Sequence, residues 1–157
     1  MTKVKHSRPA RWFRRQTLNW NRKMLAGKRA EQQLENWKSI LDKEISRSGD
    51  ESDKTYKARV MLAGSLIHMN RLAEAQMLLE HQISITKRVR GEGDSATLGA
   101  ETLLAAALLK SGKPDRAREL YVQVHKLRQE ILGNEHRDTI STRESIAKID
   151  GEGTSTA

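Results

Sequence analysis

The sequence repeats itself at an interval of 42 residues, and this spacing limits the possible fold more than any other feature. Three turn-like stretches, GDESDKT, GEGDSAT and GNEHRDT, begin at Gly49, Gly91 and Gly133. The register continues beyond them through three aligned pairs, Leu62-Ala63, Leu104-Ala105 and Ile146-Ala147. Self-similarity at a fixed period of roughly 20 to 50 residues is typical of solenoids and related repeat architectures.

Each repeat unit is predicted to contain two helices. We expect the glycine of each turn to end one helix and the threonine of the same turn to begin the next. Apolar residues from Val60 to Ile67 follow helical spacing, the pair Asn70-Arg71 interrupts the pattern, and a second amphipathic stretch follows. In the next unit the interruption at 111–113 is followed by Pro114, at a first-turn position where its missing N–H costs nothing. We therefore predict an all-α chain, a short right-handed α-solenoid of antiparallel helix pairs with an N-terminal basic helical extension.

The third turn carries the strongest resemblance to a known family. Gly133, His136, Asp138 and Thr139 are followed by an Ile-Ala pair, and residues 112–120 read G-K-x-x-x-A-x-x-L. These motifs resemble the kinesin light chain-type tetratricopeptide repeat (TPR), whose turn is close to GxxHPDT, with Arg137 in place of the proline. The resemblance covers roughly residues 49–149 and implies a TPR-like solenoid. HEAT-like repeats have a similar length but lack this turn, and they rank a distant second.

The repeat divides the chain into four predicted segments. They are a disordered basic N-terminus (1–11), a basic helical hairpin or degenerate capping repeat (12–48), TPR-like repeats (49–150) and a disordered tail (151–157). The repeat units begin at 49 and 91, and a half unit begins at 133. The segment 12–48 is a weaker copy of the repeat, because Trp20, Met24, Trp37 and Leu41 align with Leu62, Leu66, Leu79 and Ile83. Terminal units of a solenoid need a different outer face, which fits a capping role.

The net charge of +9 is concentrated at the start of the chain. Residues 1–30 hold ten Lys or Arg and no acid, whereas the other 127 residues carry 19 basic and 20 acidic side chains. One interpretation is that the aromatic stripe of this segment caps the first repeat and its arginines are solvated. A second is that the arginines bind RNA or DNA phosphates, and a third is that the helix lies on an anionic membrane. A targeting peptide is a minor fourth option. The candidate basic arm comprises Arg8, Arg11, Arg14, Arg15, Arg22 and Lys23.

No motif for catalysis, a cofactor or a metal is present. GEGDSAT lacks the lysine of a phosphate-binding loop and places Glu92 and Asp94 where phosphate would be repelled. The five histidines, among them His81 and His125, have no metal-ligand spacing, there is no cysteine, and no nucleophile turn precedes a helix. We expect a non-enzymatic protein without cofactor or metal. With no apolar run that could span a bilayer and no clear secretory signal, we expect it to be soluble and cytoplasmic.

The family resemblance also indicates where a partner would bind. In TPR arrays the first helix of each unit lines a concave groove, which implies two equivalent sets of groove-facing residues: Lys57, Val60, Gly64, Ile67 and His68, then Gly99, Thr102, Ala106, Leu109 and Lys110. His68 and Lys110 would form a basic edge; the alternative is that these are ordinary solvated residues. The family often has an asparagine just before the Leu-Ala pair, where it holds a peptide backbone. Met61, Leu103 and Ser145 stand there instead, so we expect a more apolar groove suited to contact with a helix.

Two functional hypotheses remain open at this stage. The first is an interaction module that presents the groove to a protein or peptide partner. The alternative is a nucleic-acid-associated accessory protein that binds RNA or DNA phosphates through its basic N-terminal helix. Peripheral membrane association through that helix ranks third.

Overall fold

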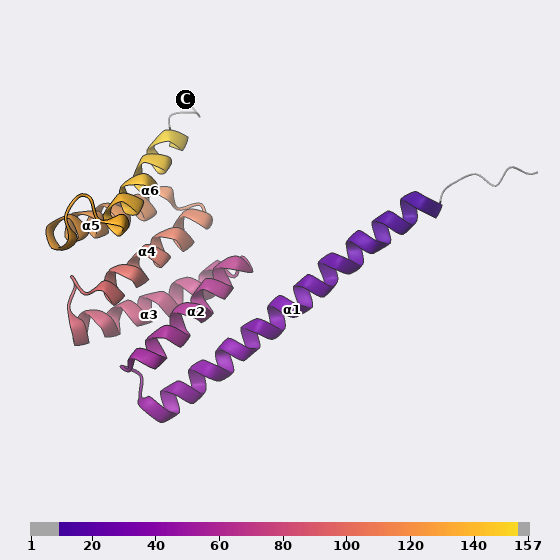
Figure 1. Ribbon diagram of the computed structural model, residues 1–157, viewed down its shortest axis with the longest axis horizontal. Helices are drawn as coiled ribbons and strands as arrows, with labels where there is room; N and C mark the ends of the chain where they lie inside the picture. The colour runs from indigo at the N-terminus through magenta and orange to yellow at the C-terminus, as the bar shows by residue number, and fades with distance from the viewer. Residues whose placement is uncertain (1–9, 154–157) are drawn as a thin grey trace, which may run out of the picture.

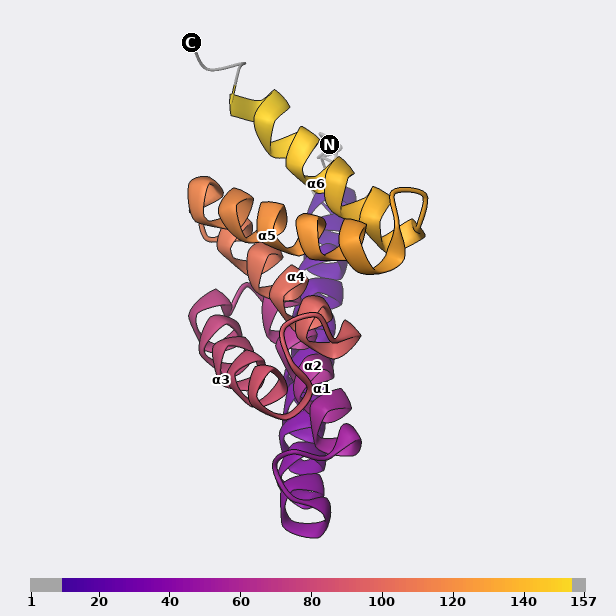
Figure 2. The ribbon, with the colours of Figure 1, turned by 90° about the vertical axis from the view of Figure 1, so that its left-hand side faces the viewer.

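The structure, a computed structural model, describes residues 10–153, and the side chains of residues 24–151 within them. In the described part every secondary-structure element is a helix: α1 (Ala10–Ser48), α2 (Asp53–His68), α3 (Leu72–Arg90), α4 (Ser95–Lys110), α5 (Pro114–Leu132) and α6 (Arg137–Gly153). Each helix packs mainly against the next one in the chain, so the helices stack in sequence order (Figure 1; Figure 2 shows the stack from its side). The predicted all-α solenoid of helix pairs is confirmed.

The glycines that open the three repeat turns end the preceding helices, as predicted. Gly49, Gly91 and Gly133 have φ angles of +80°, +94° and +85°, in the left-handed region that only glycine adopts readily. The backbone N–H of Gly91 donates to the carbonyl of Lys87 at 3.0 Å, and that of Gly133 to the carbonyl of Gln129 at 3.1 Å. The 42-residue spacing of these glycines therefore fixes where each helix pair stops.

The threonines of the same turns have a different role from the predicted one. We expected them to begin the following helices, but the N-caps are Ser52 and Asp94, three residues earlier. Their short side chains accept hydrogen bonds from backbone N–H groups of the first turn, which is the usual capping chemistry. The hydroxyls of Thr55 and Thr97 instead donate back to the carbonyls of Gly49 and Gly91, at 2.7 and 2.9 Å. Thr55 and Thr97 thus close the first two turns from within.

Two hydrophobic clusters form the core. In one, Leu34 and Leu41 of α1 pack with residues of α2 and with Ala75 of α3. The other extends from Ala63 of α2 through α4 and α5 to Ile149 of α6. Four alanines at equivalent repeat positions are fully buried and allow the helices to approach closely: Ala63, Ala75, Ala105 and Ala117.

The N-terminal helix corrects the predicted domain organisation. A hairpin over residues 12–48 is wrong for this structure, because α1 is one helix of 39 residues whose N-terminal half projects beyond the repeats (Figure 1). In the later units the turn between the two helices contains Asn70 or Gly112, with φ angles of +61° and +75°. The equivalent residue is Lys28, which lacks both the freedom of glycine and the short hydrogen-bonding side chain of asparagine that favour this conformation, so the helix continues.

The predicted ends of the chain also change where the structure describes them. Residues 10 and 11, placed in the N-terminal tail, belong to α1, and residues 151–153, placed in the C-terminal tail, belong to α6. Residues 1–9 and 154–157 lie outside the described residues. Among the described helices, none combines the length and the apolar character needed to cross a membrane.

Candidate partner-binding groove

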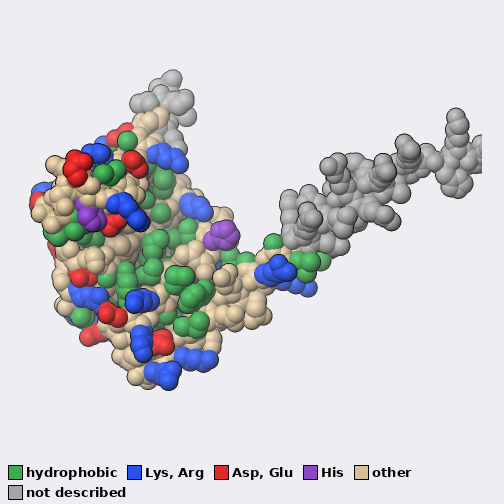
Figure 3. Space-filling model, viewed as in Figure 1, with side chains coloured by type: hydrophobic (Ala, Val, Ile, Leu, Met, Phe, Trp, Pro, Cys, Tyr) green, Lys and Arg blue, Asp and Glu red, His purple; other side chains and the backbone are tan. Residues whose placement is uncertain are grey.

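The first helices of the two full units, α2 and α4, meet α1 around an apolar recess of about 360 Å³. The walls come from Ala30 and Gln33 of α1, from Val60, Met61, Gly64, Ser65, His68 and Met69 of α2, and from Leu103 of α4. On the face of the repeats seen in Figure 3, hydrophobic side chains gather in the centre and Lys, Arg and His side chains lie toward the margins. The recess offers contact area to apolar groups but no cluster of acids or bases that could carry out a reaction.

The structure brings three of the predicted groove residues together in this recess. Val60, Gly64 and His68 lie one helical turn apart along α2 and face the same space. Lys57 is exposed one turn before Val60, toward the start of α2. The side chain of His68 is exposed at the other end of α2, so the recess has basic groups near both ends.

The remaining predicted groove residues lie outside the recess. Ile67 packs against both core clusters and serves the packing of the helices. The hydroxyl of Thr102 donates to the carbonyl of Leu98 at 2.7 Å within its own helix, and Ala106 is half-buried. The Lys110 Nζ donates to the carbonyl of Ile67 at 3.3 Å, which holds its charge at the C-terminal end of α2.

Sequence reasoning missed much of the recess wall. Met61 and Leu103 were noted only as replacements for the family's asparagine, yet both line the recess. Their position in the motif was the signal that could have found them. The wall made by Ala30 and Gln33 had no comparable signal, because the sequence predicted a hairpin in this region instead of one continuous helix.

Neither the backbone conformation nor the packing requires glycine at position 64, where the missing side chain leaves space in the recess. A β carbon at this position would meet no atom within 4 Å, and the φ angle of Gly64 is not positive. Glycine within a helix costs roughly 0.5–1 kcal/mol relative to alanine. The open space above Gly64 therefore comes at an energetic cost that the fold does not explain.

Tyr56 holds the start of α4 against α2. Its hydroxyl donates to the carbonyl of Ala96 at 3.2 Å, and the Arg90 guanidinium lies 5.9 Å from the centre of its ring. Burial raises the pKa of the Tyr56 hydroxyl above its ordinary value. A β carbon on Gly99 would come within 3.4 Å of this hydroxyl, so the predicted groove residue Gly99 provides space for Tyr56.

An ion pair joins α3 to α4 beside this contact. The Lys87 Nζ lies 2.9 Å from the buried Glu101 carboxylate, and this hydrogen bond raises the pKa of the lysine above its ordinary value. The pair fixes α4 relative to the preceding unit and lies outside the recess.

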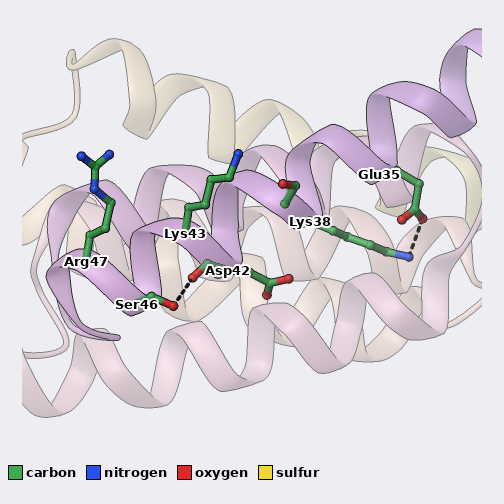
Figure 4. A pocket seen from close by; sticks show the side chains of 7 residues that line it. Glu35, Lys38, Asp42, Lys43, Ser46 and Arg47 are labelled. Carbon is green, nitrogen blue, oxygen red and sulfur yellow. Dashed lines mark hydrogen bonds and ion pairs between the residues drawn. The ribbon is translucent and has the colours of Figure 1, made fainter.

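A second hollow runs along α1 and is polar. It is lined by Glu35, Lys38, Ser39, Asp42, Lys43, Ser46 and Arg47 (Figure 4). The Lys38 Nζ lies 2.9 Å from the Glu35 carboxylate, and the Ser46 hydroxyl donates to the Asp42 carbonyl at 2.8 Å. Since every lining residue belongs to one helix, no packing between elements shapes this hollow, and it is a poor candidate for a specific site.

The remaining candidate features occupy the turns and α1. The second glycine of GEGDSAT, Gly93, makes room for Ile131, whose Cδ1 would lie 2.7 Å from a β carbon there, which fits an inter-repeat turn. In the part of the chain whose side chains are described, no three His, Asp or Glu residues are grouped as metal ligands. Of the basic arm, Arg8 lies outside the described residues, and the side chains of Arg11, Arg14, Arg15, Arg22 and Lys23 in α1 are likewise not described.

Fold and groove define the class of this protein as an all-α helical-repeat solenoid. A family model of the tetratricopeptide repeat matches residues 102–138. Two crystal structures of the nearly identical TPR-like repeats of a Podosopora anserina protein described as a kinesin light chain, one of them a substituted form, share the fold with a TM-score of 0.71 and 19% identity. BtubC (BKLC) from P. vanneervenii gives a TM-score of 0.67 and 18% identity. No curated protein matches the chain by sequence.

These comparisons confirm the predicted resemblance to the kinesin light chain-type tetratricopeptide repeat and the TPR-like fold. The alignments cover 86% of this chain and 64% of the two Podosopora structures, and 77% of this chain and 48% of BtubC. The chain therefore spans less than two thirds of the length of each of these structures. Helical-repeat folds of this kind present extended concave surfaces to binding partners.

Proposed function

We propose that this chain is a non-enzymatic scaffold that binds a segment of a partner protein in a groove, the apolar recess between α1, α2 and α4. The observation that supports the proposal is the apolar recess, whose floor is left open at Gly64. Burial of apolar side chains of the partner against Val60 and Leu103 would supply affinity, since removal of apolar surface from water is the main driving force for association.

The charges around the groove favour a partner with acidic residues beside its apolar ones. Lys57 is exposed one turn before Val60, and Lys110 lies beside the C-terminal end of α2. Charged groups at the rim of an interface contribute mainly to partner selection and association rate, whereas the apolar centre contributes most of the affinity. An amphipathic helix with an apolar face and acidic flanks has the matching chemistry.

The test compares two pairs of charge reversals in the full chain. Lys57→Glu combined with Lys110→Glu changes the groove, and Arg116→Glu combined with Lys126→Glu changes exposed residues of α5 by the same total charge. Each tagged protein is used to capture partners, with and without nuclease and at low and high salt. We expect at least one protein to be retained by the wild-type and α5 variants and reduced about tenfold or more by the groove variant.

Helical circular dichroism checks that both variants remain folded. Retention that survives nuclease treatment indicates a protein partner and not a bridging nucleic acid. If the groove and α5 variants capture the same proteins in the same amounts, the groove is not the binding surface and the proposal is wrong.

A further inference from the structure

One face of α1 is exposed although the equivalent face of α3 and α5 is buried. In each full unit this face is covered by the first helix of the same unit, and the equivalent residues are 0–5% exposed: Ala75, Leu79, Gln82, Ala117, Tyr121 and Val124. The residues that align with them in α1 are Gln33, Trp37 and Ile40. Gln33 is exposed, Trp37 is half-buried and Ile40 is 39% exposed, so no helix among the described residues covers this face of α1.

Within residues 10–153, no helix covers the neighbouring face of α2 either. In α4, Ala107 is 0% exposed, and Lys110 on the same side of the helix donates to the Ile67 carbonyl of α2. In α6 the equivalent of Ala107, Ile149, is 8% exposed. In α2 the corresponding residue is the half-buried Ser65, and Met61 on the same face is 50% exposed. The apolar recess lies between these uncovered faces of α1 and α2.

The helix that would cover both faces is encoded in the chain. Residues 13–26 align with residues 55–68 of α2 in the 42-residue register, so Trp20 and Met24 take the positions of Leu62 and Leu66. Those two leucines are 5% and 3% exposed. In the structure, residues 13–26 do not fold back but continue α1 away from the repeats (Figure 1).

We propose that residues 10–26 of a second copy of this chain cover the uncovered faces of α1 and α2, in a symmetric dimer that exchanges these segments. Each α1 then runs antiparallel to the α1 of the partner copy, in the arrangement that the two helices of a unit adopt within one chain. Exchange of an identical element is a low-cost route to a dimer, because the contacts are those the fold already uses. The exchanged helix also forms one wall of the groove, next to Met61 and Ser65.

The residue at the hinge favours exchange over folding back within one chain. The turns of the two full units use Asn70 and Gly112 with positive φ, and Lys28 stands at that position in α1. A left-handed lysine costs roughly 1–2 kcal/mol, and a turn there would also break helical hydrogen bonds. In the exchanged dimer both helices stay continuous through residues 27 and 28.

The first test is the mass of the full chain in solution, measured by sedimentation over a concentration series. We expect a dimer for the wild type and at least a tenfold weaker association for Ser65→Glu, which places a charge under the exchanged helix. Ser84→Glu, an exposed serine of α3, is the matched control and should leave the dimer intact. Because Met61 is half exposed, Met61→Glu serves as a second variant with little risk to the fold.

The second test uses the absence of cysteine in the chain. Gly64 of α2 and Leu103 of α4 line the same recess, although they belong to neighbouring repeat units. The residues 42 positions earlier are Arg22 and Met61, so in the dimer we expect Arg22 of one copy to lie near Met61 of the other. A chain with Arg22→Cys and Met61→Cys should form a disulfide between two chains under mild oxidation. Addition of Lys28→Gly, which permits the turn, should shift the same disulfide into single chains.

Three results would overturn the proposal. They are a wild type that stays monomeric throughout the concentration series, a dimer that Ser65→Glu does not weaken, and a disulfide that forms within single chains without Lys28→Gly. The last result would show that residues 10–26 fold back onto their own repeat.

Discussion

At the scale of single residues, identical amino acids serve different purposes in this chain. Gly91 allows a left-handed backbone, Gly93 makes room for Ile131, and Gly64 serves neither the backbone nor packing. The first role could be predicted from the sequence, because it recurs every 42 residues. The other two could not, since they depend on which atoms of distant helices approach the glycine.

Gly64→Ala is therefore expected to stabilise the fold while it weakens binding. Alanine removes the helical glycine penalty of roughly 0.5–1 kcal/mol, which would raise the melting temperature by about 1–4 °C. Its methyl group would enter the recess and reduce the affinity for a partner captured by the wild type. Gly27→Ala, at another helical glycine with open space around it, is the control for stability. Equal affinity of Gly64→Ala and the wild type would argue against the groove.

At the scale of helices, the sequence predicts α2 to α6 well and α1 poorly. The five later helices are bounded by local turn chemistry, with glycine at the end of α3 and α5 and Pro114 in the first turn of α5. In α1 the aligned apolar residues suggested a hairpin, but the register alone does not supply a turn where Lys28 replaces Asn70 or Gly112. The backbone preference of the residue at position 28 therefore determines that α1 is one continuous helix, despite the repeat pattern.

Buried charge between the helices also escaped sequence reasoning. A helical pattern assigns Arg59 to the surface, yet it is 1% exposed, forms an ion pair with Asp50 and donates to the side chain of Gln82. Its burial depends on partners from the preceding turn and from α3, which no local pattern reveals. The contact joins the turn, α2 and α3 through a single guanidinium.

Removal of Asp50 is expected to destabilise the protein much more than removal of its neighbour Glu51. Asp50→Ala removes a half-exposed carboxylate from the buried Arg59 guanidinium, and loss of a hydrogen bond to such a charged group costs roughly 1.5–3 kcal/mol. Glu51→Ala breaks only the exposed pair with Arg88, which contributes at most about 1 kcal/mol. Urea denaturation of the two variants gives the comparison. Similar losses of unfolding free energy in the two variants would show that the pair between Arg59 and Asp50 stabilises the fold no more than the exposed pair does.

At the scale of the whole molecule, the basic N-terminal segment ends close to the point in α1 where packing against α2 begins. The ten basic residues of 1–30 precede the part of α1 that packs on α2 through Leu34 and Leu41, and the repeats that follow are nearly neutral. The N-terminal segment can therefore act in assembly or recognition without the core depending on it. The sequence showed this charge asymmetry directly, whereas the point at which packing begins became clear only from the structure.

Two deletions test where the folded unit begins. A chain that lacks residues 1–26 keeps every contact of the two core clusters, so we expect it to remain helical, to melt cooperatively and to be monomeric. A chain that lacks residues 1–41 also loses Leu34 and Leu41, whose burial contributes roughly 1.5–3 kcal/mol each. That loss is comparable to the stability of a small domain, so α2 should unfold and the protein should aggregate. Circular dichroism melting of both chains decides the matter. If deletion of residues 1–26 already unfolds the repeats, these residues belong to the folded unit. The prediction that the folded unit begins after residue 26 is then wrong.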